Sequence, residues 1–347
     1  MSFKFRLVHW NRQKIIYDGI IFGLIFLYLS VFIVGNLFVI PEITRETLII
    51  RAFGTLSLIL LHIVLSIGPL TRLNPIFLPL LYNRRHLGVT TFFIASVHGI
   101  FSIIQFHSSG NVNPLLSIFI SNTRYESFTS FPFQTLGFVA LIILFIMAFT
   151  SHDFWLEKLG TRFWKTLHML VYLAYFLIII HVQIGVMQFE TSTLFSFLIG
   201  IGMVWIITIH LIAGRKEFKF DNTKSNLNHD GFVPVCHVDE IKNNRAKVVS
   251  LSKNRVAIFK YGNKISAISN ICKHQNGPLG EGRIIDGCIT CPWHGYQYLP
   301  NNGTSPPPFT EKVATYSVMI KDNKIWVNPA ANAEGEHVEP ALINQKL

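Results

Sequence analysis

The chain has 347 residues, of which 50% are hydrophobic and only 14% are charged. This composition is too apolar for an ordinary soluble enzyme, and the length allows two or three domains. The formal net charge is +11, but much of the lysine and arginine flanks long apolar segments, as in membrane proteins. We therefore expect no nucleic-acid partner. The four cysteines all lie between Cys236 and Cys291, which excludes a disulfide scaffold.

Six apolar segments within residues 1–214 are each long enough to cross a membrane. They run over residues 15–40, 51–71, 87–107, 132–150, 163–187 and 192–214. A helix needs about 20 residues to cross a hydrocarbon core of about 30 Å, and backbone satisfaction inside lipid favours helices over single strands. The sequence therefore predicts a six-helix, all-α transmembrane bundle in contact with membrane lipid.

The basic residues that flank these segments indicate their orientation. Lysine and arginine concentrate before the first segment and after the second, fourth and sixth: Lys4, Arg6, Arg12, Lys14, Arg72, Arg84, Arg85, Lys158, Arg162, Lys165, Arg215, Lys216 and Lys219. By the positive-inside rule, both termini lie in the cytoplasm. We expect an integral protein of the bacterial inner membrane with a cytoplasmic C-terminal domain.

Histidines within the apolar segments are functional hypotheses, because histidine is rare inside a bilayer. The alternative for any one of them is an interhelical hydrogen bond. His98 and His181 fall at comparable depths, so two facing helices can supply two axial imidazoles to a haem iron. His168 lies closer to the cytoplasm. It precedes His181 by 13 residues, a rotation of about 140° on an ideal helix, so the two share a face only if the helix bends.

The rest of the chain has the pattern of a small soluble domain. Residues 215–230 are polar and charged, and we expect a linker there. Over residues 231–330, short runs such as VVSL and VAIFKY alternate with turn signals such as NNG, which predicts a small antiparallel all-β domain. Residues 331–347 are polar without periodicity, so we expect a disordered tail. The fold class is a multi-domain membrane protein with a helical bundle followed by this β domain.

Two short motifs in the β domain carry metal-ligand residues: Cys272-Lys-His274 and Cys291-Pro-Trp-His294. In a Rieske-type [2Fe–2S] centre, two cysteines hold one iron and two histidines hold the other, and each motif supplies one of each. Zinc also accepts two cysteines and two histidines, but its sites usually begin with two cysteines close together. A chain without metal would need a coincidence of spacing. These four residues are the predicted cluster ligands.

The second motif continues as CPWHGYQYLPNNGT, and the first as CKHQNGPLGEG. Over residues 231–329 the sequence resembles Rieske ferredoxins that supply aromatic-ring dioxygenases. Rieske proteins of cytochrome bc complexes carry a loop-bridging disulfide, whose partners would fall at Gly277 and Trp293, and neither is cysteine. The resemblance therefore implies the ferredoxin subtype, with a low Rieske potential and with histidine ligands near the surface.

Three further segments carry a second resemblance. They are residues 51–73 (RAFGTLSLILLHIVLSIGPLTRL), 83–98 (NRRHLGVTTFFIASVH) and 150–181 (TSHDFWLEKLGTRFWKTLHMLVYLAYFLIIIH). They resemble the ferric-reductase-like transmembrane family, and within it the haem-binding membrane subunits of bacterial periplasmic methionine sulfoxide reductase systems. The resemblance implies b-type haem ligated by His98, His168 and His181. Related NADPH oxidases stack two haems on four histidines. His86 and His62 are the candidates for a fourth ligand, so one haem is implied and a second is left open.

Three functions are compatible with these features, and the chain contains no G-x-G-x-x-G nucleotide fingerprint. The first is transmembrane electron transfer from a cytosolic donor, through the cluster and haem, to an extracytoplasmic acceptor or partner reductase. The second is a self-contained reductase of Fe(III) or Cu(II). The third is a Rieske ferredoxin anchored to the membrane without haem. We favour the first, and the sequence leaves open whether the chain has a substrate of its own.

Overall fold

The computed structural model describes residues 12–81, 83–127, 130–189, 193–222, 231–274, 276–292 and 295–343. The chain forms two compact units, Met1–Gly214 and Arg215–Leu347. The first unit is helical, and the second consists mainly of antiparallel strands.

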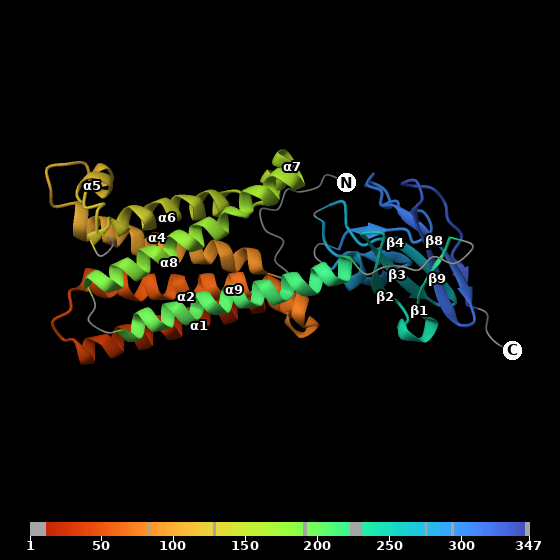
Figure 1. Ribbon diagram of the computed structural model, residues 1–347, viewed down its shortest axis with the longest axis horizontal. Helices are drawn as coiled ribbons and strands as arrows, with labels where there is room; N and C mark the ends of the chain where they lie inside the picture. Colours follow the sequence, from red (N-terminus) through yellow and green to blue (C-terminus); the bar gives the residue numbers. More distant parts are fainter. Residues whose placement is uncertain are drawn as a thin grey trace. The chain divides into compact units, whose positions relative to one another are not determined.

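The first unit is a bundle of long helices that run roughly alongside one another (Figure 1). Short helices connect some of them. The helices are α1 (Arg12–Val39), α2 (Arg45–Leu73), η1 (Pro75–Phe77), α3 (Leu78–Leu81), α4 (Arg84–His107), α5 (Pro114–Ile120), α6 (Phe133–Phe149), α7 (Asp153–His168), α8 (Leu170–Phe189) and α9 (Thr193–Asp221). Residues 215–221 of α9 belong to the second unit.

Five helices of the described residues are long and apolar enough to cross a membrane, with 24 to 29 residues each. They correspond to five of the six predicted spans. The remaining one, α6, is apolar but has only 17 residues. At about 1.5 Å per residue it is about 25 Å long, slightly less than a typical hydrocarbon core. The structure therefore gives five candidate membrane spans, and α6 meets the sixth prediction in composition but not in length.

Apolar side chains cover the outside of the bundle as well as its inside, because the outer faces contact lipid rather than water. Large apolar side chains on the outer faces are exposed in the isolated chain; Phe26 and Phe38 of α1, for example, are 73% and 82% exposed. Such faces are satisfied by acyl chains. Inside, α2 packs against α4, α6 packs against α8, and α4 contacts α6. This order brings the histidines of α4 and α8 into the same interior.

The fifth predicted span corresponds to Arg162–Gly185, one of the five segments above, which α7 and α8 share. Helix α7 ends at His168 and α8 begins at Leu170, with Met169 between them. Within α7, Gly160 has φ +74°, a left-handed conformation that favours glycine. Met169 itself has helical angles, φ −69° and ψ −17°, so the kink of this segment lies at Gly160, before both His168 and His181.

The second unit confirms the predicted antiparallel β domain and contains two sheets. The larger has the order β1-β9-β8-β4-β3-β2 with β10 paired to β4, and the smaller has the order β5-β6-β7. The strands are β1 (Val233–His237), β2 (Arg245–Leu251), β3 (Asn254–Tyr261), β4 (Lys264–Ser269), β5 (Arg283–Ile285), β6 (Cys288–Thr290), β7 (Gln297–Tyr298), β8 (Thr315–Lys321), β9 (Lys324–Ala331) and β10 (Ala341–Leu342).

Strand β3 is buried on both faces, because successive side chains of a strand point to opposite sides. Val256 and Ile258 lie in one apolar core. Ala257 and Phe259 lie in a second core, together with the cysteines of both predicted ligand motifs. The cysteines of both candidate ligand motifs therefore lie in the same apolar core, on one face of β3.

Two boundary predictions require correction. Residues 215–221, expected as the start of the linker 215–230, continue helix α9 to Asp221; residues 223–230 lie outside the described residues. The expected disordered tail, 331–347, contains the end of β9 and the paired strand β10; residues 344–347 lie outside the described residues. Between those strands the amide of Val338 donates to the carbonyl of Asn301 at 2.7 Å. A segment that is held by main-chain hydrogen bonds needs no periodic apolar side chains, so its order could not be predicted from the sequence pattern.

The β unit should be much more sensitive to truncation of Leu251 than of Leu342. Leu251 is 1% exposed and Leu342 is 57% exposed. Leu251→Ala should lower the free energy of unfolding by about 2–5 kcal/mol through lost burial and a cavity. Leu342→Ala should change it by about 0.5 kcal/mol or less. Pulse proteolysis across a guanidinium series measures both, and equal losses would show that the core does not lie where the structure places it.

Candidate redox centres

Both cysteine–histidine motifs lie on tight loops with the same hydrogen-bond pattern. The first loop follows β4, and the second joins β6 to β7. In each loop the cysteine amide donates to the carbonyl five residues later, and the cysteine carbonyl accepts from the amide four residues later. These bonds join Cys272 to Gly277 and Asn276, and Cys291 to Tyr296 and Gly295, at 2.7 to 3.0 Å.

Each loop reverses at a residue with positive φ. Asn276 has φ +57° and Gly295 has φ +73°, and asparagine and glycine are the residues that tolerate this conformation best. The residue in question lies four positions after the cysteine in both loops. The two turns are therefore equivalent at their cysteines, although the two motifs differ in spacing.

The cysteines of the two loops are buried in the same apolar core. Cys272 is 1% exposed and Cys291 is 2% exposed, and Leu279, Ile289 and Tyr298 belong to the same cluster. All four cysteines of the chain are described, and none forms a disulfide. This agrees with the ferredoxin subtype implied by the sequence.

Cys236 and Cys288 are also buried, but outside the ligand loops. Burial raises the pKa of both thiols, with smaller contributions from neighbouring charges. They therefore remain neutral thiols rather than thiolate ligands at ordinary pH.

His274 lies on the first loop, with its ring stacked on Tyr296. The ring centroids are 5.2 Å apart and the interplanar angle is 8°. Its Nδ1 atom is buried. His294, the fourth predicted ligand, lies outside the described residues. The structure thus places three of the four predicted ligands on two adjoining loops.

A [2Fe–2S] cluster of Rieske type needs two thiolates on one iron and two imidazoles on the other. The two buried cysteines and His274 supply three of these donors. In the described part of the chain, no three His, Cys, Asp or Glu side chains converge as a group that could hold a single metal ion. His294 lies outside the described residues, so that search did not include the fourth donor. The donor set of the two motifs, thiols and imidazoles, is the one that a Rieske cluster takes.

Tyr298 was not identified from the sequence, and it contacts a candidate ligand directly. Its hydroxyl oxygen lies 3.4 Å from Sγ of Cys272 and accepts a hydrogen bond from the amide of Lys273 at 3.0 Å. Tyr298 is fully buried. Burial, and then the hydrogen bond with Cys272, raise the pKa of Tyr298 well above its usual value. The hydroxyl therefore keeps its proton and can donate it to the sulfur.

Within the helical unit, the structure brings His98 and His181 together. The ring centroids are 6.2 Å apart, with planes at 80°. Metal–imidazole bonds are about 2.0–2.1 Å long, so two bonds end to end take roughly 4 Å, and the two ring radii supply the remainder. The separation therefore fits one metal ion held between the two rings.

Both rings are held in the same way by a neighbouring helix. Nδ1 of His98 lies 2.9 Å from the carbonyl of Ile50 in α2. Nδ1 of His181 lies 2.7 Å from the carbonyl of Phe133 in α6. A carbonyl only accepts, so Nδ1 carries the proton in each neutral ring and Nε2 has the lone pair that a metal requires.

A glycine lies four residues after each of these carbonyls. A Cβ atom on Gly54 would lie 2.7 Å from His98, and one on Gly137 would lie 2.6 Å from His181. In an α-helix the carbonyl of one residue faces the residue four positions later. Glycine there leaves the carbonyl accessible and makes room for the ring. These two glycines form cradles that a side chain would fill, as expected for rings held ready for a prosthetic group.

His168 also fits a ligand role. Its Nδ1 lies 3.0 Å from the carbonyl of Trp164, and its ring stacks on that indole with centroids 3.8 Å apart. Its Nε2 is buried and has no hydrogen-bond partner among the described residues. A buried acceptor without a partner is costly, and a metal ion would satisfy it.

The two candidates for a fourth ligand differ. Nδ1 of His86 pairs with Asp18 of α1 at 2.9 Å, which engages one ring nitrogen. Nδ1 of His62 lies 2.8 Å from the carbonyl of Leu58, and its Nε2 lies 3.1 Å from the hydroxyl of Tyr175. Ligation by His62 would therefore require loss of the Tyr175 bond, whereas ligation by His86 would leave its bond to Asp18 in place.

Removal of the Tyr298 hydroxyl should lower the midpoint potential of the cluster. A hydrogen bond to a cluster sulfur favours the more negative, reduced state. A loss of about 1 kcal/mol of differential stabilisation corresponds to roughly 40 mV for one electron. Tyr298→Phe should therefore titrate at a lower potential in an EPR-monitored redox titration. Tyr316→Phe is the control, because Tyr316 is also buried but lies in the other core. Equal midpoint potentials in Tyr298→Phe and the wild type would show that Tyr298 does not act on the cluster.

Comparisons with known proteins match both units. The model of the Rieske [2Fe-2S] domain matches residues 231–317, and the model of the ferric reductase like transmembrane component matches residues 51–179. The ferredoxin subunit of anthranilate 1,2-dioxygenase from Burkholderia cepacia is 32% identical over 98 residues, 27% of this chain and 89% of that protein. The ferredoxin of carbazole 1,9a-dioxygenase from Nocardioides aromaticivorans matches 28% of this chain and 98% of that structure, with 25% identity and a TM-score of 0.27.

The helical unit matches a different class of relative. The haem-binding subunit MsrQ of protein-methionine-sulfoxide reductase from Herminiimonas arsenicoxydans is 32% identical over 165 residues, 47% of this chain and 68% of that protein. These matches confirm both resemblances and support a [2Fe–2S] cluster in the β unit. The chain is a membrane electron-transfer protein that belongs to the ferric-reductase-like transmembrane family through its helical unit and to the Rieske [2Fe–2S] family through its β unit.

Proposed function

We propose that the chain carries single electrons across a membrane, from a cytosolic donor to an extracytoplasmic acceptor or partner reductase. The path runs through a cluster held by Cys272, His274, Cys291 and His294, and then through the histidine sites of the helical unit. When bound, a Rieske cluster and b-type haem each exchange one electron at a time. The observation that carries the proposal is the pair of imidazoles from α4 and α8, 6.2 Å apart, in a chain that also has a Rieske domain.

In this proposal, some residues of the chain orient the ligand side chains, and others exclude water from them. The carbonyls of Ile50 and Phe133 orient His98 and His181, so that each ring presents Nε2. His168 supplies a third, buried ring nitrogen, and His86 is the candidate that completes a second haem site. In the β unit, burial of Cys272 and Cys291 excludes water from the sulfur ligands, which limits side reactions of the cluster.

The proposed location is the bacterial inner membrane, and in the proposed orientation both termini lie in the cytoplasm. The basic residues that flank the spans support it. A reducing compartment also suits a β unit whose four cysteines form no disulfide. A relative named as a haem-binding subunit of a reductase supports a separate reductase as acceptor. The alternative of a ferredoxin anchored without haem leaves the two glycine cradles and the facing histidines without a role.

The haem assignment is tested by His181→Ala in the purified chain. Loss of one axial nitrogen should abolish or strongly reduce the sharp b-type bands of the reduced-minus-oxidised spectrum, while the EPR signal of the cluster persists. His210→Ala is the control, because His210 is also a membrane histidine but bonds to Tyr172 and the carbonyl of Ile206. Unchanged haem content in His181→Ala would remove His181 as a ligand. A wild-type spectrum without b-type bands would favour the anchored ferredoxin.

A further inference from the structure

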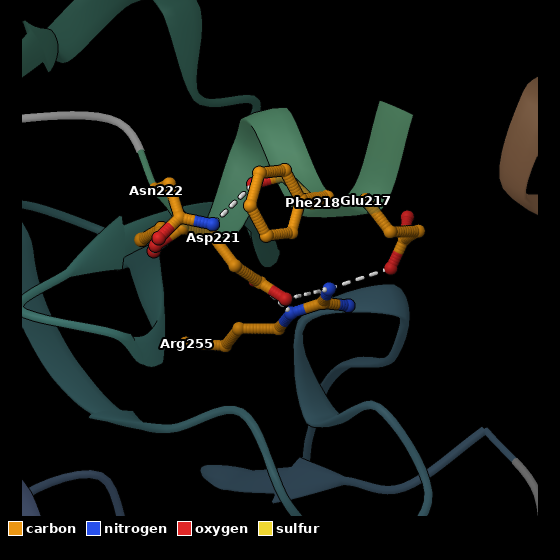
Figure 2. Close-up of polar contacts among 6 residues, drawn as sticks. Glu217, Phe218, Asp221, Asn222 and Arg255 are labelled. Atoms are coloured by element: carbon orange, nitrogen blue, oxygen red, sulfur yellow. Dashed lines mark hydrogen bonds and ion pairs between the residues drawn. The ribbon is translucent and has the colours of Figure 1, made fainter. Parts of the chain in front are cut away.

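Arg255, the second residue of β3, binds two carboxylates from the end of α9 (Figure 2). Its Nε donates to Oδ1 of Asp221 at 2.7 Å, and its Nη2 donates to Oδ2 of the same carboxylate at 2.8 Å. Nη2 also lies 2.6 Å from Oε2 of Glu217. The guanidinium group lies 5.5 Å from the ring centre of Phe220. A bidentate pair reinforced by a second carboxylate is the arrangement in which arginine binds most strongly.

The position of these two carboxylates favours a cation beside them. Glu217 and Asp221 lie near the C-terminal end of α9, where the helix dipole places partial negative charge, so acidic side chains there are unfavourable without a cation. Strand β2 adds a second contact, because the hydroxyl of Ser250 donates to the carbonyl of Asp221 at 3.1 Å. That carbonyl is one of those left without a partner by the end of the helix. Strand residues thus complete the helix terminus.

The main chain of Arg255 leads from this contact to the first ligand loop. Its carbonyl accepts a hydrogen bond from the amide of Asn270 at 2.8 Å. The side-chain oxygen of Asn270 accepts from the amide of Gly280 at 2.7 Å, and Asn270 lies two residues before Cys272. One residue therefore holds the end of α9 through its side chain and supports the ligand loop through its backbone.

Charge provides a further connection between α9 and this loop. Burial, and then the neighbouring charge of Glu217, raise the pKa of Glu281, which lies in the turn η4 (Leu279–Glu281) that closes the loop. Without Arg255, the carboxylate of Glu217 would act on Glu281 without the cation that now binds it. Repulsion would then act on the same contact that the lost hydrogen bonds had held.

We propose that Arg255 is a positioning residue for electron transfer: it makes the last turns of α9 a structural part of the cluster-binding domain, so that the domain is attached to the last membrane helix by side-chain bonds as well as by the covalent chain. A second point of attachment limits the volume that a tethered site explores and raises its effective concentration at its redox partner. The attachment stands on the contacts above, whereas its consequence for electron transfer rests on the proposed function.

The test uses the purified holoprotein and two independent readouts. In Arg255→Gln, hydrogen exchange of the amides of residues 218–222 should accelerate by about tenfold, because the helix end loses its charged partner. The rate at which one electron passes from the reduced cluster to oxidised haem should fall by roughly tenfold. The cluster EPR signal and the haem spectrum should stay as in the wild type. Arg255→Lys, which keeps the charge but not the bidentate geometry, should lie between the two.

Two further variants distinguish the contact between Arg255 and α9 from general effects of charge. Asp221→Asn removes the same bidentate pair from the helix side and should reproduce both changes. Lys247→Gln is the matched control, because it breaks an ion pair of similar exposure between Lys247 and Glu240, at 2.5 Å, away from α9. It should leave both readouts unchanged.

Unchanged exchange in both Arg255→Gln and Asp221→Asn would overturn the attachment. Faster exchange with an unchanged electron-transfer rate would overturn the positioning role. If the wild-type protein itself transfers no electron from cluster to haem, the proposed function fails and the positioning role fails with it, while the exchange difference still reports on the attachment. The two failures are therefore distinguishable.

Discussion

A hydrogen-bond donor inside a bilayer must find an acceptor within the protein, and this constraint shapes the helical unit around His98 and His181. Each ring donates to a main-chain carbonyl of a neighbouring helix, and each of those helices has glycine four residues after that carbonyl. Because glycine has no side chain, it leaves the carbonyl accessible and also makes room for the imidazole ring. Two helix pairs, α2 with α4 and α6 with α8, use this device, and contact between α4 and α6 brings the two rings to 6.2 Å.

The β unit solves a related problem with loops instead of helices. Two turns with the same hydrogen bonds and the same positive-φ residue place Cys272 and Cys291 in one core. Tyr298 closes that core against the first loop, with its hydroxyl between the sulfur of Cys272 and the amide of Lys273. In both units, backbone groups hold the side chains that we propose as ligands. Preorganised ligands of this kind reduce the rearrangement that accompanies each electron transfer.

The sequence predicted the parts of this architecture that depend on local pattern. Five of the six predicted spans, the antiparallel β domain and both family resemblances follow from spacing, hydropathy and turn residues, whereas the ligand assignments stay predictions. The contacts that complete the sites join residues far apart in the chain. His98 is 48 residues from Ile50, and Arg255 is 34 residues from Asp221. Gly54, Gly137, Tyr298 and Arg255 could not be assigned roles from local pattern for this reason.

The wrong boundaries have physical causes as well. Hydropathy reports where a helix leaves an apolar environment, not where its backbone ends, so α9 continues past residue 214 to Asp221. Composition also fails to detect a polar segment that is ordered by main-chain bonds, as between Val338 and Asn301. Each error concerns a segment whose order comes from tertiary contacts rather than from its own sequence.

The most direct test of the account is the reduction of haem by a cytosolic-side donor in Cys291→Ser, compared with Cys288→Ser. The two cysteines are three residues apart and both are buried, but only Cys291 lies in a ligand loop. The account predicts that Cys291→Ser loses the cluster signal and donor-driven haem reduction, while dithionite still reduces its haem, and that Cys288→Ser retains all three. Donor-driven reduction at the wild-type rate in Cys291→Ser would show that the cluster is not on the electron path.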